Sequence, residues 1–453
     1  MRHFSASAMF AAILCTCVSA GCRTPSTTEG NILLISIDTL RADHMATYGY
    51  ARRTTPNVDE FFSHADVFER AYATSSYTSA SMISVLSGLL PQHHRVRLFD
   101  QLVSDDVRLI TEMLPERFQV TAFVSNGVLS DAGLGIASRF DHFDESMVWR
   151  SDPPQLERDA DATTDAALDW LDAEYDRSRP LFMWVHYMDP HRPYDPPSPW
   201  DSKFDRDLEG ENAPEHVLNH KQQARAASAF EFIDNYDREI AYTDAAVGRL
   251  LDRFSAIVGL DGAMVVFTAD HGETLAERYK GSFQHASAVY EEQVRVPLMV
   301  RVAGSRARRV AIPVSGIDVL PTMLSFAGVR VPTALTGVDL LEPAALKEDR
   351  VVFSESLSSP WRPQKRAATR ANEKWVVGLS REDGRVSTRS LYDLNADPGE
   401  TAALPWRSSS GPGEELLSLV ATDPDPGGKP EDPRRGELNA NHPALLRLLG
   451  YVE

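Results

Sequence analysis

Four runs of mostly apolar residues predict buried strands in the core of a folded domain. Each run lacks the regular polar alternation of a half-exposed strand. They are residues 31–37, 120–124, 181–186 and 263–268. Between them lie amphipathic stretches with helical spacing, such as residues 162–172 and 226–254. This alternation predicts an α/β fold with a doubly wound, mostly parallel sheet, which binds its ligands outside the carboxyl ends of the strands.

The pattern changes at about residue 350, where shorter and more polar strands such as residues 374–378 and 387–392 begin. They predict a small C-terminal α+β subdomain. Residues 424–435 are rich in Pro, Gly and charge, which is typical of a linker. We therefore expect four segments: a signal peptide (1–22), a catalytic domain (30–349), the small subdomain (350–422) and a linker with a C-terminal tail (423–453).

The N-terminus has the features of an export signal. Arg2 and His3 precede a mostly apolar run over residues 4–18, which is too short to predict a transmembrane helix. Residues 18–22 resemble a bacterial lipobox, although Ser19 stands where Leu is typical. We expect export and a lipid anchor at Cys22, and hence a periplasmic or outer-surface lipoprotein. Simple secretion and an incidental cysteine are the alternatives.

The composition limits which kinds of protein this chain can be and which residue types can form a metal site. The chain has 43% hydrophobic and 25% charged residues, as a folded globular protein does. Its net charge of −19 argues against nucleic acid as a partner. All three cysteines lie within residues 15–22, so a metal site in the mature protein must use carboxylate, imidazole and hydroxyl groups.

Acidic and imidazole side chains follow the predicted strands at their carboxyl ends. Asp38 follows the first strand, Asp189 and His191 follow the third, and Asp270 with His271 follows the fourth. Each carboxylate alone could cap a helix N-terminus. Together they indicate a metal site, because several converging buried charges would otherwise lack partners.

Residues 74–84 form a hydroxyl-rich turn that enters an apolar helical stretch over residues 83–90. A helix N-terminus binds anions through its free N–H groups, and a Ser or Thr there could ligate a metal and act as a nucleophile. The alternative is a series of helix caps and turn hydroxyls without a catalytic role.

An ordered series of motifs resembles the sulfatase family of the alkaline-phosphatase superfamily, over about residues 31–404. The motifs cover the family's opening metal segment, the segment behind the nucleophile, a substrate-binding loop, a second metal segment and a C-terminal signature. They lie at residues 31–43, 54–59, 84–94, 186–194, 268–273, 285, 290–297 and 391–400. The resemblance implies the fold predicted above and an ester-hydrolysing enzyme.

The nucleophile position departs from the sulfatase pattern. Sulfatases convert a Cys or Ser within Cys/Ser-x-Pro-x-Arg to formylglycine, but aligning Gly88 with the family's glycine puts Thr78 at this position. Ala80 replaces the Pro and Met82 replaces the Arg. We therefore expect no formylglycine. The resemblance to Thr-dependent phosphodiesterases and transferases of the same superfamily implies that Thr78 is itself the nucleophile.

Neighbouring hydroxyls leave alternatives open at this position. A slip in the alignment would move the nucleophile to Ser76, Ser79 or Ser81. The metal set departs as well, since Thr39 stands where many sulfatases have a second Asp.

The resemblance implies a site with one divalent metal, Zn²⁺, Mn²⁺ or Ca²⁺. Its ligands are expected to be Asp38, Thr78, Asp270 and His271. The remaining groups are assigned to the substrate: His191 and His285 to catalysis and to the non-bridging ester oxygens, and Asp189 to substrate binding.

The predicted function is metal-dependent hydrolysis of a sulfate or phosphate ester by in-line attack of Thr78. The expected substrate is a small-molecule, glycan or lipid ester. One alternative is a phosphodiesterase or phospho-group transferase of the same superfamily. Another is a catalytically silent surface protein that keeps the sulfatase fold for binding glycans or lipids.

Overall fold

The computed structural model describes residues 30–97, 101–151, 154–204, 229–278, 283–305, 307–356, 364–380, 383–407 and 411–424. The predicted signal peptide with Cys22 and nearly all of the predicted linker and tail lie outside these ranges. Within them, no helix combines the length and the apolar character needed to cross a bilayer.

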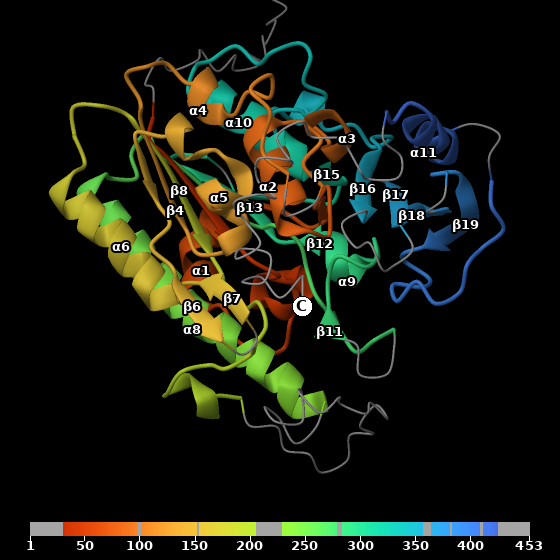
Figure 1. Cartoon of the computed structure of the whole chain (residues 1–453), viewed down its shortest axis with the longest axis horizontal. Coiled ribbons are helices and arrows are strands. Elements are labelled where there is room, and N and C mark those ends of the chain that lie inside the picture. Colours follow the sequence, from red (N-terminus) through yellow and green to blue (C-terminus); the bar gives the residue numbers. More distant parts are fainter. Residues whose placement is uncertain are drawn as a thin grey trace, which may run out of the picture.

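An eight-stranded, mostly parallel sheet forms the centre of the molecule (Figure 1). In spatial order its strands are β14 (Arg308–Val310), β2 (Asp66–Phe68), β13 (Leu298–Val302), β9 (Met264–Ala269), β1 (Ile32–Ile37), β8 (Leu181–Tyr187), β4 (Gln119–Val124) and β5 (His142–Asp144). Strand β13 runs antiparallel to both of its neighbours. The four predicted core strands are β1, β4, β8 and β9, and every residue of β1, β8 and β9 is buried.

Helices lie on both sides of this sheet, as a doubly wound fold requires (Figure 1). The long helices α6 (Ala160–Ala173) and α8 (Ala229–Ile257) pack together on one side, and α2 (Thr78–Ser87) packs against α10 (Val319–Phe326) on the other. Shorter helices connect the remaining elements: α1 (Pro56–Phe61), α3 (Pro91–His94), α4 (Ile110–Met113), α5 (Asp131–Leu134) and α9 (Glu291–Val294).

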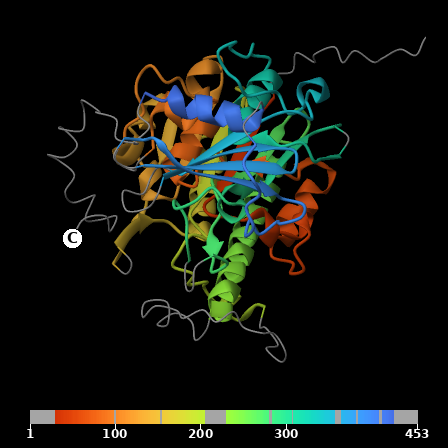
Figure 2. The ribbon, with the colours of Figure 1, turned by 90° about the vertical axis from the view of Figure 1, so that its right-hand side faces the viewer.

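The C-terminal part forms a separate antiparallel sheet of four strands beside the main sheet. These strands are β16 (Val352–Ser356), β17 (Gln364–Arg370), β18 (Glu373–Leu379) and β19 (Val386–Asp393). Helix α11 (Pro412–Ala421) packs against β17 and β18 and lies across this sheet (Figure 2). Two-stranded pairs β6–β7 (Val148–Ser151, Pro154–Glu157) and β10–β11 (Thr274–Leu275, Phe283–Gln284), and the strands β12 (Arg295–Val296), β3 (Ala71–Tyr72) and β15 (Val314–Ser315), complete the structure. The predicted fold class is confirmed.

Helix α2 differs from the sequence prediction at both of its ends. It begins at Thr78, inside the hydroxyl-rich segment that we expected to be a turn, and it ends at Ser87. Hydroxyls are tolerated within it because Ser84 and Ser87 donate hydrogen bonds to carbonyls one turn earlier, at 3.1 and 2.6 Å. Gly88 then adopts a left-handed conformation with φ of 69°, which ends the helix before the two leucines that follow.

Candidate metal centre and active site

The register of the main sheet brings Asp38 and Asp270 together. Strands β1 and β9 pair in parallel with Ile37 opposite Ala269, so the next residue on each strand is a carboxylate at the same edge. His271 follows directly. One ligand-type atom from each of Asp38, Asp270 and His271 lies within 4.8 Å of the others, and all three residues are fully buried. Three of the four predicted metal ligands therefore form one cluster.

The hydrogen bonds of these three residues leave free atoms of the kind that hold a metal. Asp38 Oδ2 accepts from Asn126 Nδ2 at 2.6 Å, and Asp270 Oδ1 accepts the backbone N–H of Thr39 at 3.0 Å. Asp38 Oδ1 and Asp270 Oδ2 have no hydrogen-bond partner. His271 Nδ1–H donates to a backbone carbonyl at 2.9 Å, which leaves Nε2 with a lone pair. Two carboxylate oxygens and one imidazole nitrogen fit a divalent cation.

The pKa shifts of these residues show an electrostatic repulsion that a bound cation would reduce. Burial and the charge of Asp38 raise the pKa of Asp270. Burial opposes ionisation of Asp38 too, but the nearby His186 side chain and the charges of His191 and His271 hold its pKa below the ordinary range. Burial disfavours a charged His271, yet the two carboxylates raise its pKa. In the absence of a cation the two carboxylates repel each other.

Thr78 lies at this cluster, as the first residue of α2. Its Oγ1 is 3.2 Å from His271 Nε2 and 3.4 Å from Asp38 Oδ2. The first hydrogen bond within the helix joins Ser81 N–H to the Tyr77 carbonyl, so the N–H groups of residues 78–80 have no partner within the helix. The hydroxyl and these N–H groups lie together at a helix N-terminus, which suits a bound anion.

The alternative serines have different surroundings. Ser81 Oγ donates to the backbone carbonyl of Asp270 at 2.6 Å, while the hydroxyls of Ser76 and Ser79 are buried without a hydrogen-bond partner. Among the described contacts of this segment, Thr78 supplies the hydroxyl that reaches two of the predicted metal ligands.

The two predicted substrate histidines also lie beside the cluster. The His285 ring is 4.6 Å from the His271 ring and 5.0 Å from the His191 ring, measured between centroids. His191 Nδ1–H donates to the Arg192 carbonyl at 2.7 Å, and His285 Nδ1 pairs with Glu273 at 3.2 Å. Burial lowers the pKa of His191 to about 4, so its Nε2 is an acceptor at neutral pH and becomes a donor on protonation.

Asp189 has a different location from the one that a substrate-binding role suggests. Its Oδ2 accepts the backbone N–H of Ala160 at 2.8 Å, at the N-terminus of α6. Burial and the neighbouring carboxylate Glu157 raise the pKa of Asp189 to about 7. The structure therefore gives Asp189 the capping contact that strand-end carboxylates often make, and its contact with a substrate stays a prediction.

Sequence reasoning missed the residues that hold Asp38 in place. Asn126 lies two residues beyond β4, and this polar residue at a strand end was a usable signal. His186 lies within β8 with its Nε2 at 3.6 Å from Asp38 Oδ2 and its Nδ1 at 2.8 Å from Ser36 Oγ. Trp184 Nε1–H donates to the same Ser36 oxygen at 2.9 Å. A pattern of buried residues does not tell which strand neighbours such a histidine contacts.

Comparisons with known proteins identify the family of the chain and proteins of the same fold. A sequence model of the sulfatase family matches residues 30–329. An uncharacterised sulfatase YidJ of Escherichia coli K12 is 29% identical over 226 residues, which cover 47% of this chain and 42% of YidJ, so the match spans less than half of either protein.

Two solved structures have the same fold. A structure described as a complex with its substrate D-glucosamine-2-N,6-O-disulfate has a TM-score of 0.68 at 19% identity, covering 89% of this chain and 99% of the other. A phosphonate monoester hydrolase from Silicibacter pomeroyi has a TM-score of 0.62 at 18% identity, covering 86% and 94%. The motifs, the fold and the family match agree, and the chain belongs to the sulfatase family of ester hydrolases.

Proposed function

We propose that this protein hydrolyses sulfate esters through direct attack of the Thr78 hydroxyl on sulfur. The observation that carries the proposal is the position of Thr78 Oγ1, 3.2 Å from His271 Nε2 and 3.4 Å from Asp38 Oδ2, at the N-terminus of α2. A nucleophile, a set of metal ligands and an anion-binding helix end meet at one point.

The residues around Thr78 would bind the cation, orient its ligands and bind the ester oxygens. Asp38, Asp270 and His271 would hold a divalent cation, with Asn126 and backbone N–H groups fixing the two carboxylates. Such a cation lowers the pKa of a hydroxyl bound to it and neutralises charge that develops on the transferred group. The free N–H groups of residues 78–80 are placed to bind non-bridging oxygens of the ester. The imidazole rings of His191 and His285, which lie beside the cluster, would contact the same oxygens.

The reaction that follows has two displacements. In the first, the bond from Thr78 Oγ1 to sulfur forms as the bond from sulfur to the leaving alcohol breaks. The product is a threonyl sulfate ester and an alcohol. In the second, water attacks the same sulfur, releases sulfate and restores the Thr78 hydroxyl. An alcohol in place of water would make the enzyme a transferase.

A sulfated sugar is the substrate class that we favour, because a protein of the same fold is described with a disulfated glucosamine as its substrate. A phosphate or phosphonate ester is the second candidate. It is supported by Thr78 in place of the family's Cys or Ser, and by the phosphonate monoester hydrolase of similar fold. A silent binding protein would have no need for two unpartnered carboxylate oxygens beside a buried hydroxyl.

A parallel assay tests the proposal. The purified protein, loaded in turn with Zn²⁺, Mn²⁺ and Ca²⁺, is given an aryl sulfate, a phosphate monoester, a phosphodiester and a phosphonate monoester. We expect aryl sulfate to be hydrolysed fastest with one of the ions. Ser87→Ala, at the other end of α2, is the matched control and should keep full activity. Faster turnover of a phosphorus ester would favour the second candidate, and turnover of none would favour the binding protein.

We also propose export and lipid attachment at Cys22, on the sequence alone. Mass spectrometry of the N-terminal peptide from membranes of the producing organism checks this. An unmodified peptide that retains Arg2 would contradict it.

A further inference from the structure

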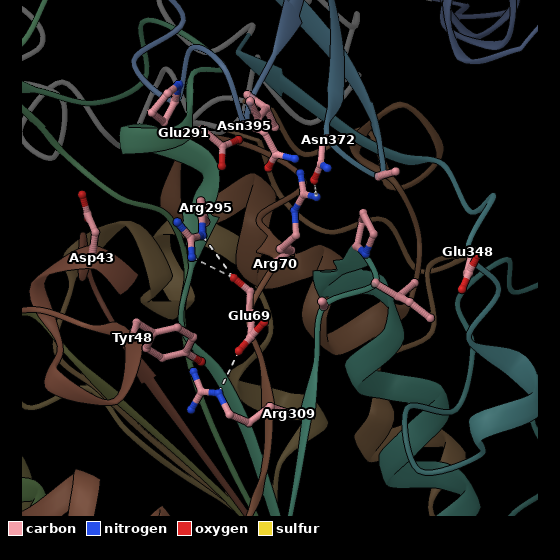
Figure 3. Close-up of a pocket in the computed structure, with 16 residues that line it drawn as sticks. Asp43, Tyr48, Glu69, Arg70, Glu291, Arg295, Arg309, Glu348, Asn372 and Asn395 are labelled. Atoms are coloured by element: carbon pink, nitrogen blue, oxygen red, sulfur yellow. Dashed lines mark hydrogen bonds and ion pairs between the residues drawn. The ribbon is translucent and has the colours of Figure 1, made fainter.

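A cavity lies between the main sheet and the C-terminal sheet. Its volume is about 680 Å³. Arg70 and Arg309 come from the edge of the main sheet, Arg295 from β12, and Asn372 and Asn395 from the turns of the C-terminal sheet. Figure 3 shows these side chains around the cavity. No residue of the Thr78 cluster lines it.

One residue of the cavity lining, Arg70, lies at the same edge of the main sheet as the cluster around Thr78. Strand β2 pairs with β13 and β13 with β9, both antiparallel, so β2 and β9 run in the same direction. Arg70 therefore leaves β2 at the edge where Asp270 leaves β9. Two strand spacings separate these strands, which places the two residues about 10 to 15 Å apart along the edge. One extended molecule could reach both.

Two arginines of this cavity have no carboxylate partner. The Arg295 guanidinium donates to the backbone carbonyl of Glu69 at 2.9 and 3.1 Å, and Arg70 donates to the side-chain oxygen of Asn372 (Figure 3). Neither forms an ion pair with any carboxylate of the described ranges. Arg70 and Arg295 are both half-buried, so their charges face the cavity with reduced screening.

Most of the carboxylates around the cavity already have a cationic partner, although Arg41 also pairs with Glu277 and Lys374 also pairs with Glu400. Glu69 is paired with Arg309 at 2.7 Å, and Glu291 with the buried Lys374 at 2.9 Å. Asp43 is paired with Arg41, which lies outside the cavity lining, at 2.7 Å. The exposed Glu348 at the rim is the remaining acidic residue of the lining. The interior therefore offers two guanidinium groups to an anion.

The other lining groups suit a sugar that carries the anion. Asn372 and Asn395 offer amide donors and acceptors, and Glu348 can accept from hydroxyl groups. Ile312 and Pro313 supply a short apolar wall. A guanidinium group binds planar or tetrahedral oxyanions through paired N–H groups.

We propose that this cavity is a second anion-binding subsite, in which Arg70 and Arg295 bind a sulfate or carboxylate group on a distal sugar of an acidic oligosaccharide. The proposal rests on the proposed function for the identity of the substrate, since the scissile ester of that oligosaccharide would lie at Thr78. It implies selection for oligosaccharides over single sugars.

The test measures binding without turnover. Full-length Thr78→Ala protein is titrated by calorimetry with a heparin-derived hexasaccharide, with glucosamine 6-sulfate and with inorganic sulfate. The same titrations are made after adding Arg70→Gln and Arg295→Gln together, or the control Arg385→Gln in an exposed turn of the C-terminal sheet. Thermal unfolding shows that each variant is folded.

We expect the double substitution to weaken hexasaccharide binding at least tenfold and to leave glucosamine 6-sulfate binding within twofold. Arg385→Gln should change neither. In protein with Thr78 intact, the double substitution should raise KM for the hexasaccharide and leave the hydrolysis of aryl sulfate unchanged.

Two results would overturn the inference. Unchanged hexasaccharide binding would show that the cavity does not contact the oligosaccharide. Loss of inorganic sulfate binding to the same extent would show a simple anion site instead of a sugar subsite. If the arginine variants weaken binding but no sulfate ester is hydrolysed, the subsite stands and the proposed function fails.

Discussion

Two buried clusters of charged side chains differ in whether oppositely charged side chains compensate them. One joins the C-terminal sheet to the main body and consists of Arg97, Glu355, Arg366 and Asp423. Arg97 contacts Glu355 at 2.8 Å and Asp423 at 2.6 Å, and Arg366 pairs with the same two carboxylates. The other is the candidate metal cluster of Asp38, Asp270 and His271, where the two carboxylates make no ion pair with any Lys or Arg of the described ranges.

The difference separates a structural role from a functional one. In the first cluster each described guanidinium group pairs with both described carboxylates, so the buried charges compensate one another. In the candidate metal cluster, Asp38 Oδ1 and Asp270 Oδ2 have no hydrogen-bond partner among the described residues and only His271 Nε2 nearby, at 4.0 and 3.4 Å, which a fold tolerates when a ligand supplies what is missing. The first cluster should therefore control stability, and the second should control metal binding and turnover.

The largest effect is expected from Asp270→Asn. The variant should lose most of its bound divalent metal, and turnover should fall by about three orders of magnitude or more, since the ion and the nucleophile act as a unit. The metal-free variant should be at least as stable as metal-free wild type at neutral pH, because the raised pKa of Asp270 marks its ionised form as destabilising. Elemental analysis, rates and melting curves check this. Unchanged metal content would refute the assignment.

Glu355→Gln should have the opposite effect, a loss of stability without a loss of metal. Removal of this carboxylate takes away one of the two described partners of each buried guanidinium group, which lowers the free energy of unfolding by about 3 kcal/mol or more. Metal content per folded molecule should stay the same. Urea denaturation measures the change, with Glu415→Gln on the exposed face of α11 as the control. Loss of metal without loss of stability would reverse the roles given to the two clusters.

Asn126→Ala tests how the candidate metal cluster is held in place. Asn126 orients Asp38 from outside the ligand set, and removal of such an orienting contact weakens metal binding by about 10- to 100-fold. Competition with a chelator measures the affinity, and the free energy of unfolding of the metal-free protein serves as the control. Equal affinity in the variant and the wild type would show that Asp38 needs no support from this amide.

The smallest effect is expected from Asp189→Asn, and it depends on pH. The pKa of Asp189 is about 7 in the folded protein, against an ordinary value of 3.8. Wild-type stability should therefore fall as pH rises from about 4 through 7, since the unfolded chain releases this proton first. The amide can still cap α6, so the variant should gain about 1 kcal/mol relative to wild type between pH 6 and pH 7. A pH-independent difference would contradict this account, and a raised KM would support the predicted substrate contact.

The sequence predicted the fold and which side chains would lie together around Asp38 and Asp270, because both depend on strand ends. Continuous apolar runs locate β1 and β9, and parallel pairing brings the residues after them to one edge. The predicted start of α2 was wrong. A run of Ser and Thr residues is typical of a turn, and the sequence does not show that Ser84 and Ser87 bond to carbonyls within the helix. His186 was missed because its contact crosses from β8 to the end of β1, and the cavity with Arg70 and Arg295 because it joins segments far apart in the chain.

The central claim is that Thr78 carries the transferred group, and one measurement tests it directly. The metal-loaded protein is mixed with excess aryl sulfate and quenched in acid within the first turnover, and the peptides are analysed by mass spectrometry. The account predicts a sulfo group on Thr78, the same modification at this position in Thr78→Ser with part of the rate, and no modification in Thr78→Ala with turnover reduced at least a thousandfold. A sulfo group on Ser76, Ser79 or Ser81, or full activity in Thr78→Ala, would contradict it.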